Sequence, residues 1–243
     1  MCWAPMSGTR LLRRLAAAAI ALCWGVVLHA PQAARAQSHG QVDLLLVLAV
    51  DASGSVNHTR FELQKQGYAA AFRHPRVLRA IRTGATAAIA VTMTQWTGPT
   101  QQIQVVPWTV IKDHASAQAF AAAVDAAPRQ LFSGGTSISG AIDHAMTLLP
   151  TAPYRGLKQV IDVSGDGSNN RGRPANAARD DAVAAGVSIN GLPILSLEPY
   201  LDRYYFDYVI GGPGAFMVPA ESYETFADAV LRKLIMEIAS NER

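Results

Sequence analysis

The stretch Val42-Asp-Leu-Leu-Leu-Val-Leu-Ala-Val-Asp51-Ala-Ser53-Gly-Ser55 decides the fold, because a long apolar run ends here in a carboxylate followed by two hydroxyls. An apolar run of this kind predicts a strand that is buried on both faces of a sheet. A carboxylate at the end of a buried strand needs a partner, since burying an unpaired charge is costly. Ser53 and Ser55 follow at alternate positions, so both can point the same way as Asp51. The stretch therefore indicates a divalent cation site at a strand end.

Strands and helices alternate along the rest of the chain. The predicted strands are residues 42–50, 86–96, 103–108, 158–164, 187–195 and 215–218. The first predicted helix runs from Asn57 or Thr59 to His74, with a further turn over 77–81. The next helices are predicted over 116–126, from Gly134-Gly135-Thr136 to 149, and over 174–185. The last predicted helix starts at Pro219 or Ser222 and ends at 238. This order predicts an α/β fold with a doubly wound, mostly parallel central sheet, helices on both faces, and one antiparallel edge strand, formed by a hairpin that runs from Met93 to Val106.

The N-terminal 36 residues have the features of a secretory signal peptide. Arg10, Arg13 and Arg14 precede an apolar run, and Ala34-x-Ala36 fits a cleavage site. We therefore expect a signal peptide over 1–36, a short lead-in over 37–41, and one domain over 42–240. This division predicts a periplasmic or secreted protein with no membrane span in the mature chain. An uncleaved membrane anchor is the alternative.

The leader also accounts for the basic composition. The whole chain of 243 residues has 21 Lys and Arg against 18 Asp and Glu, but four of the basic residues and none of the acidic ones lie in the leader. The remaining chain has 17 basic and 18 acidic residues, so its charge gives no reason to expect nucleic-acid binding. Cys2 and Cys23 both lie in the leader, which predicts a mature protein without disulfides or thiolate chemistry.

Two further segments can bring oxygen ligands to the edge of the sheet where Asp51 lies. In a parallel sheet, ligands gather at the carboxyl ends of the strands. The candidate metal ligands are Asp51, Ser53, Ser55, Thr136 and Asp166. Because all five are oxygen ligands, the set favours magnesium, with manganese or calcium as alternatives, over zinc or copper. Asn169 and Asn170 are expected to order the loop after Asp166 through side-chain to backbone hydrogen bonds.

The motifs Asp51-x-Ser53-x-Ser55, Gly135-Thr136 and Ser164-Gly165-Asp166-Gly167 follow one another in this order. Over about residues 40–240 the chain thus resembles the von Willebrand factor type A (vWA) domain. The metal-ion-dependent adhesion site (MIDAS) of that family uses Asp-x-Ser-x-Ser, a distal Thr and a distal Asp. The leader and the segments 134–140, 162–170 and 211–216 further resemble an exported bacterial vWA-like family of uncharacterised function.

The resemblance implies a role for each candidate ligand. Ser53, Ser55 and Thr136 would offer hydroxyls to the metal, and Asp51 and Asp166 would bind it directly or through water. A protein partner would supply an Asp or Glu carboxylate to the remaining coordination position. The sequence departs from the family pattern at Gly165, where the family has Thr, so a hydroxyl beside Asp166 is lost.

Enzymatic activity is not predicted. Asp51-Ala-Ser-Gly and Asp162-Val-Ser-Gly each have one residue too many for an aspartic protease motif, and no Gly-x-Ser-x-Gly elbow precedes a suitable His. Asp162 lies inside a strand and is expected to be a structural carboxylate. Two alternatives to metal-dependent partner binding remain, namely a hydrolase that uses the same metal to activate water and a purely structural envelope protein.

Overall fold

The computed structural model describes residues 1–3 and 40–239 of the chain, and it confirms the predicted fold class. Most of the predicted signal peptide and part of the lead-in lie outside the described residues. The elements in chain order are β1 (Gly40–Asp51), α1 (His58–Arg73), α2 (Pro75–Thr83), β2 (Ile89–Trp96), β3 (Gln102–Ile111), α3 (His114–Ala126), α4 (Ile138–Leu148), the 3-10 turn η1 (Leu149–Thr151), β4 (Tyr154–Gly165), α5 (Ala175–Ala184), β5 (Ser188–Pro193), α6 (Leu201–Tyr204), the π-helical turn η2 (Tyr205–Val209) and α7 (Phe226–Ala239).

The five strands form one sheet in the order β3-β2-β1-β4-β5. β1 lies at its centre and pairs in parallel with both β2 and β4. β3 runs antiparallel to β2 at the edge, as predicted, and Met93 lies opposite Val106. The chain winds from β1 to β2 in one direction and later returns past β1 to β4. The carboxyl ends of β1 and β4 therefore flank the point where the winding direction reverses, which is where ligands bind in open α/β sheets.

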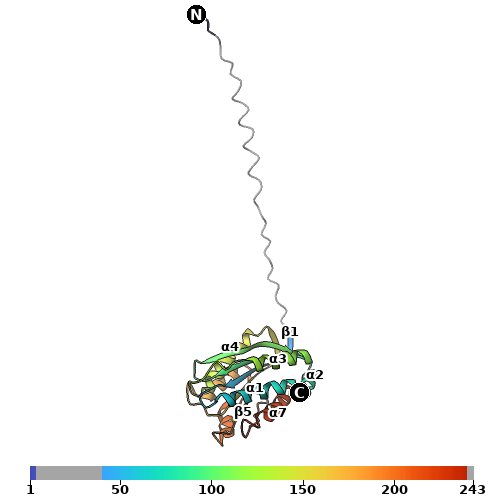
Figure 1. Ribbon diagram of the computed structural model, residues 1–243, viewed down its shortest axis with the longest axis vertical. Coiled ribbons are helices and arrows are strands. Elements are labelled where there is room, and N and C mark those ends of the chain that lie inside the picture. The colour runs from blue at the N-terminus through green and yellow to red at the C-terminus, as the bar shows by residue number, and fades with distance from the viewer. Residues whose placement is uncertain (4–39, 240–243) are drawn as a thin grey trace. The chain divides into compact units, whose positions relative to one another are not determined.

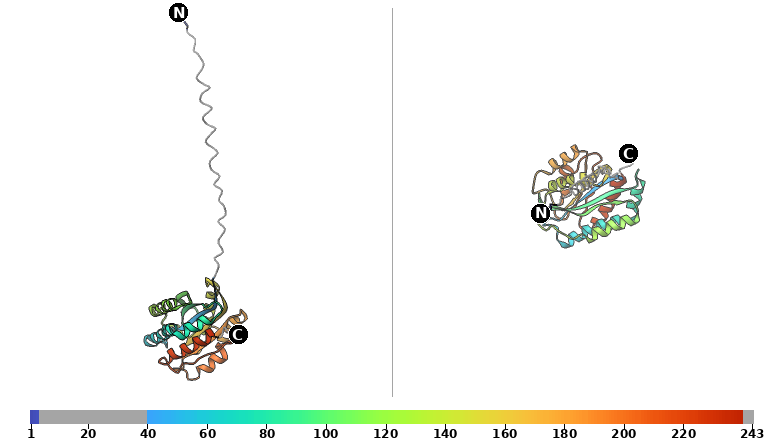
Figure 2. Two further views of the ribbon diagram at one scale, coloured as in Figure 1. Left: turned by 90° about the vertical axis from the view of Figure 1, so that its right-hand side faces the viewer. Right: turned by 90° about the horizontal axis from the view of Figure 1, so that it is seen from above.

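Helices cover both faces of the sheet (Figures 1 and 2). On one face α1 lies between α3 and α7 and packs against both, and α2 also contacts α7. Phe61, Tyr68 and Phe72 of α1 belong to the hydrophobic core on this side. On the other face α4 and α5 pack together, and Ile138 and Ala178 contribute to a second core. Since β1 is covered on both faces, its run from Val42 to Val50 is buried throughout.

Several boundaries differ from those predicted. β1 begins at Gly40, two residues before its apolar run. Asn57 caps α1 as expected, since its side chain accepts the Arg60 N–H. The helix expected at Gly134-Gly135-Thr136 begins at Ile138, because the Ser137 side chain caps it by accepting the Gly140 N–H. Hydrogen-bonding side chains thus decide where both helices begin.

Two predictions in the C-terminal part are wrong. The strand expected over residues 215–218 is replaced by isolated bridges, one of them between Gly191 and Met217. The Phe216 N–H donates to the Asn190 side chain, so it does not take part in a strand ladder. The last helix begins at Phe226, later than predicted. In the described part of the chain, no helix has the length and apolar character needed to cross a membrane.

A buried charge cluster fastens α7 to the sheet. Lys233 is fully buried, with its Nζ 2.8 Å from Asp162 Oδ2 on β4 and 2.9 Å from Glu237 Oε2 one turn along α7. Asn190 on β5 donates to Glu237 Oε1 at 2.7 Å. Burial raises the pKa of Asp162 to about 7, against the opposing effect of Lys233. These contacts confirm that Asp162 is a structural carboxylate.

Removing Lys233 tests this cluster. The variant Lys233→Met leaves Asp162 and Glu237 buried without the ammonium group between them, so we expect it to lower the free energy of unfolding by about 3–5 kcal/mol. Urea denaturation measures the loss. The triple variant that adds Asp162→Asn and Glu237→Gln is the control, and it is expected to recover most of the stability. A loss below about 1 kcal/mol in the single variant would contradict this account.

Candidate metal centre

Asp51 lies at the end of the central strand and is fully buried. Its Oδ1 accepts the backbone N–H of Ser53 at 2.7 Å, which turns the chain directly after the strand. Its Oδ2 is buried and has no hydrogen-bond partner. Burial raises the pKa of Asp51 to about 7, and the nearby charge of Asp166 adds to the effect. The ionised carboxylate therefore needs a positive charge that the surrounding residues do not fully supply.

A chain of short contacts links Ser53 and Ser55 to Asp166. The Ser53 and Ser55 hydroxyl oxygens are 3.2 Å apart, and the Ser55 hydroxyl donates to Asp166 Oδ1 at 2.6 Å. Gly165 allows the close approach of the two strand ends, since a Cβ there would lie 3.0 Å from Asp51 Oδ2 and 3.1 Å from the Trp96 ring. This crowding explains why glycine replaces the larger residue of the vWA pattern.

Thr136 reaches the same edge of the sheet from the loop before α4. A Cβ placed on Gly167 would lie 3.6 Å from Thr136 Oγ1, so the Thr136 hydroxyl lies close to the residue that follows Asp166. Thr136 itself is mostly buried. The structure thus brings all five predicted residues, Asp51, Ser53, Ser55, Thr136 and Asp166, to one edge of the sheet.

Asn169 and Asn170 hold the Thr136 loop in place. Asn170 Oδ1 accepts the Thr136 N–H at 3.0 Å, and the Thr136 carbonyl accepts the Asn170 N–H at 2.9 Å. Asn169 Oδ1 accepts the Ser139 N–H at 3.1 Å. As predicted, an asparagine side chain orders its own loop, since Asn169 donates to the Arg173 carbonyl, and the other hydrogen bonds join this loop to the neighbouring one. They fix the position of Thr136 relative to Asp166.

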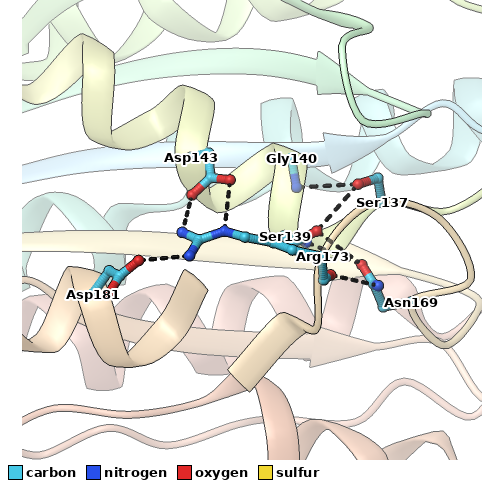
Figure 3. A network of polar contacts seen from close by, with 7 residues as sticks. All are labelled: Ser137, Ser139, Gly140, Asp143, Asn169, Arg173 and Asp181. Atoms are coloured by element: carbon cyan, nitrogen blue, oxygen red, sulfur yellow. Dashed lines mark hydrogen bonds and ion pairs between the residues drawn. The ribbon is translucent and has the colours of Figure 1, made fainter. Parts of the chain in front are cut away.

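Arg173 extends this connection to the helices behind the loops (Figure 3). Its guanidinium binds Asp143 on α4 and Asp181 on α5. Its carbonyl accepts a hydrogen bond from the Asn169 side chain at 3.1 Å. The Ser137 hydroxyl, which caps α4, belongs to the same network of polar contacts (Figure 3). The loops that carry Thr136 and Asp166 are therefore braced against two helices as well as against each other.

Tyr223 and Arg60 support Asp166, and sequence reasoning missed both. The Tyr223 hydroxyl donates to Asp166 Oδ2 at 2.8 Å. Arg60 Nη1 lies 3.6 Å from the same oxygen and donates to the Ser55 carbonyl at 2.8 Å. Tyr223 thus replaces the hydroxyl that is lost at Gly165. No motif marks Tyr223, because it lies 57 residues from Asp166 in the chain.

Arg129 and Glu198 complete the surroundings, and no sequence motif marks them either. Arg129 Nη2 donates to the carbonyls of Ala52 at 3.0 Å and Ser53 at 3.1 Å. Glu198 accepts the Ser168 N–H at 3.0 Å and also the Ser168 hydroxyl. Both residues hold the backbone of a ligand-bearing loop from outside.

The donor set fits a hard divalent cation. Within residues 1–3 and 40–239, no three His, Cys, Asp or Glu side chains are grouped to hold a metal, so the candidate set consists of two carboxylates and three hydroxyls. Two carboxylates and three hydroxyls are ligands that magnesium accepts, with water in the remaining positions. The buried Oδ2 of Asp51, which lacks a hydrogen-bond partner, is an acceptor that such a cation would satisfy.

The chain belongs to the family described as "Protein of unknown function (DUF1194)", which matches residues 41–242. Comparison with curated proteins returns no match.

Solved structures with vWA domains share the fold. Proximal thread matrix protein 1 from the mussel byssus is 14% identical with a TM-score of 0.54, over 82% of this chain and 46% of its own. The pilus adhesin SpaC from Lactobacillus rhamnosus GG is 16% identical with a TM-score of 0.57, over 84% of this chain and 32% of its own. The vWF domain of the pilus tip protein Mfa5 from Porphyromonas gingivalis is 12% identical with a TM-score of 0.56, over 83% and 97%. This chain thus spans less than half of the byssus protein and of SpaC.

The raised pKa of Asp51 predicts a pH effect on stability when metal is removed by EDTA. The folded state binds the Asp51 proton more tightly than the unfolded state does. Protonation of Asp51 therefore stabilises the folded state at acidic pH, and this stabilisation is lost as the pH rises through about 7. We expect Asp51→Asn, which carries no charge, to gain stability relative to the wild type by about 1 kcal/mol or more between pH 5.5 and pH 8.5.

Urea denaturation at the two pH values measures this difference. Asp162 titrates in both proteins, so its contribution cancels in the comparison. Parallel pH profiles for the wild type and Asp51→Asn would show that Asp51 is not destabilised by burial.

Proposed function

We propose that the chain is an exported vWA domain that binds a protein partner through a divalent cation, with magnesium as the preferred ion. The observation that carries the proposal is the buried Asp51 Oδ2, which lacks a hydrogen-bond partner at the strand end where vWA-like folds place their ligands. The proposed ligands are Asp51, Ser53, Ser55, Thr136 and Asp166.

Each part of the surrounding structure has a task in this proposal. When bound, the cation supplies a positive charge that can accept an anionic oxygen from a partner. Ser55 already donates its proton to Asp166, so its oxygen lone pairs can turn to the cation. Tyr223 and Arg60 orient Asp166, and Asn170 positions Thr136. The residues around the ligands therefore favour a preformed site over one that forms only upon binding.

Exposed apolar side chains favour a protein as the partner. Tyr200 and Phe206, which follow Glu198 in the chain, are 72% and 66% exposed, and Leu197, directly before Glu198, is 49% exposed. Glu198 itself binds Ser168, two residues from Asp166, so this segment borders the candidate site. On the side of Arg129, Phe132 is 63% exposed. Aromatic side chains that surround a polar contact are typical of protein interfaces.

The proposal disfavours the hydrolase alternative. A hydrolase needs a general base within hydrogen-bond reach of the metal-bound water. Glu198 is a carboxylate close to the site, but both of its oxygens accept hydrogen bonds from Ser168. The aspartates of the site would be occupied by the cation. A purely structural role is the remaining alternative, and it predicts no effect of metal on partner binding.

Magnesium titration tests the cation site. Isothermal titration calorimetry of the wild type is expected to show one binding event, and Asp51→Ala and Ser53→Ala are each expected to weaken it by at least about tenfold, because each removes a direct ligand. Asp180→Asn is the matched control, since this aspartate side chain is 65% exposed on α5 outside the site. Absence of binding by the wild type, or unchanged binding by Asp51→Ala, would contradict the proposal.

Partner capture from a cell-envelope extract tests the adhesion function. The wild type and Asp180→Asn are expected to retain a protein in magnesium buffer, to release it in EDTA and to recapture it when magnesium is restored. Asp51→Ala is expected to retain none in either buffer. Capture that is insensitive to EDTA would favour the structural alternative.

A further inference from the structure

Three arginines approach the candidate site from different segments. Arg129 donates to the carbonyls of Ala52 and Ser53, on the first ligand-bearing loop. Arg60 binds the Ser55 carbonyl and faces Asp166. The third is Arg171, which follows the asparagine that holds Thr136. The surroundings of the site are thus rich in cationic side chains even before a metal is added.

Arg171 lies across Gly135, directly beside Thr136. A Cβ placed on Gly135 would meet Arg171 Cγ at 2.7 Å and Nε at 3.3 Å, so the side chain occupies the space that glycine leaves free. The Arg171 backbone N–H donates to the Thr136 carbonyl at 3.1 Å. The backbone of Arg171 is therefore held next to a proposed metal ligand, and its side chain covers Gly135.

The guanidinium of Arg171 has no partner among the described residues. Across residues 40–239 it has neither a hydrogen bond nor an ion pair, and the residue is exposed. Arg173, two residues later, differs in this respect because Asp143 and Asp181 both bind it. An arginine with free donors beside a metal centre is available to a ligand, and its planar group suits a carboxylate.

The other two arginines near the site have partners or charges within it. Arg60 faces Asp166 and also contributes to lowering the pKa of Glu224, which Ser222 lowers most. Asp51 opposes the lowering of the Arg129 pKa that burial causes. Arg60 and Arg129 are thus coupled to the aspartates of the site, whereas Arg171 lies on the side of Thr136.

We propose that the partner presents an acidic segment with two carboxylates, one that reaches the metal and a second that binds Arg171. This inference rests on the proposed function, since the first carboxylate needs the cation. Arg171 is then a specificity-determining residue that selects acidic pairs over single acids. Arg60 and Arg129 contribute positive charge but use donors on the site's own backbone.

Synthetic capped peptides test this inference on the full chain saturated with Mg²⁺. One peptide carries a single Asp within glycines, and four others carry a second Asp one to four positions later. Binding is followed by chemical shift changes in NMR spectra. The best peptide with two acids is expected to bind the wild type about tenfold more tightly than the peptide with one acid, as one charge-assisted pair would give.

The variants separate a specific contact from general attraction. Arg171→Gln keeps the backbone hydrogen bond to Thr136 and is expected to reduce the preference to less than about twofold, with Arg171→Lys in between. Arg79→Gln, which removes the same charge from the exposed face of α2, is expected to keep the full preference. Absence of a preference in the wild type, or a preference that survives in Arg171→Gln, would overturn the inference.

Magnesium titration of the same samples distinguishes the two levels of proposal. If the wild type and Arg171→Gln both bind Mg²⁺ and neither prefers two acids, the second subsite is wrong and the cation site stands. If the wild type does not bind Mg²⁺, the proposed function fails and the subsite fails with it.

Discussion

The structure depends on one unfavourable placement, the carboxylate of Asp51 buried at the end of the central strand. The strand must be apolar because helices cover both of its faces, and this same burial raises the pKa of the acid that follows. The Ser53 backbone satisfies one oxygen and leaves the other with no hydrogen bond. A fold can retain a buried carboxylate of this kind when it belongs to a functional site. The hydroxyls and the second carboxylate beside Asp51 are consistent with the proposed cation site.

The loops around Asp51 are held mainly by each other. Asn169 and Asn170 follow one strand but bind the loop before α4, and Arg129 binds the loop after β1 from a different segment. Hydrogen bonds between loops keep the oxygen atoms in place at this edge. This arrangement separates stability, which the two cores and the Lys233 cluster supply, from the positioning of the candidate ligands.

The sequence predicted the sheet and the candidate ligands because both follow from local patterns. The apolar run before Asp51 and the spacing of Ser53 and Ser55 are visible in a short window, and so is Asp166 after its own strand. Tyr223, Arg129 and Glu198 were not predictable in this way, because each is placed by tertiary packing. The strand expected at 215–218 failed for the same reason, since a side chain of β5 takes its hydrogen bond.

Tyr223 has a consequence for the order in which the molecule is assembled. Its hydroxyl binds Asp166, so the oxygen cluster draws on segments that extend from β1 to the turn before the last helix. An N-terminal fragment that ends before this turn contains the aspartates and hydroxyls but lacks the donor that steadies one of them. The chain must therefore be folded as far as this turn before the cluster reaches its final geometry.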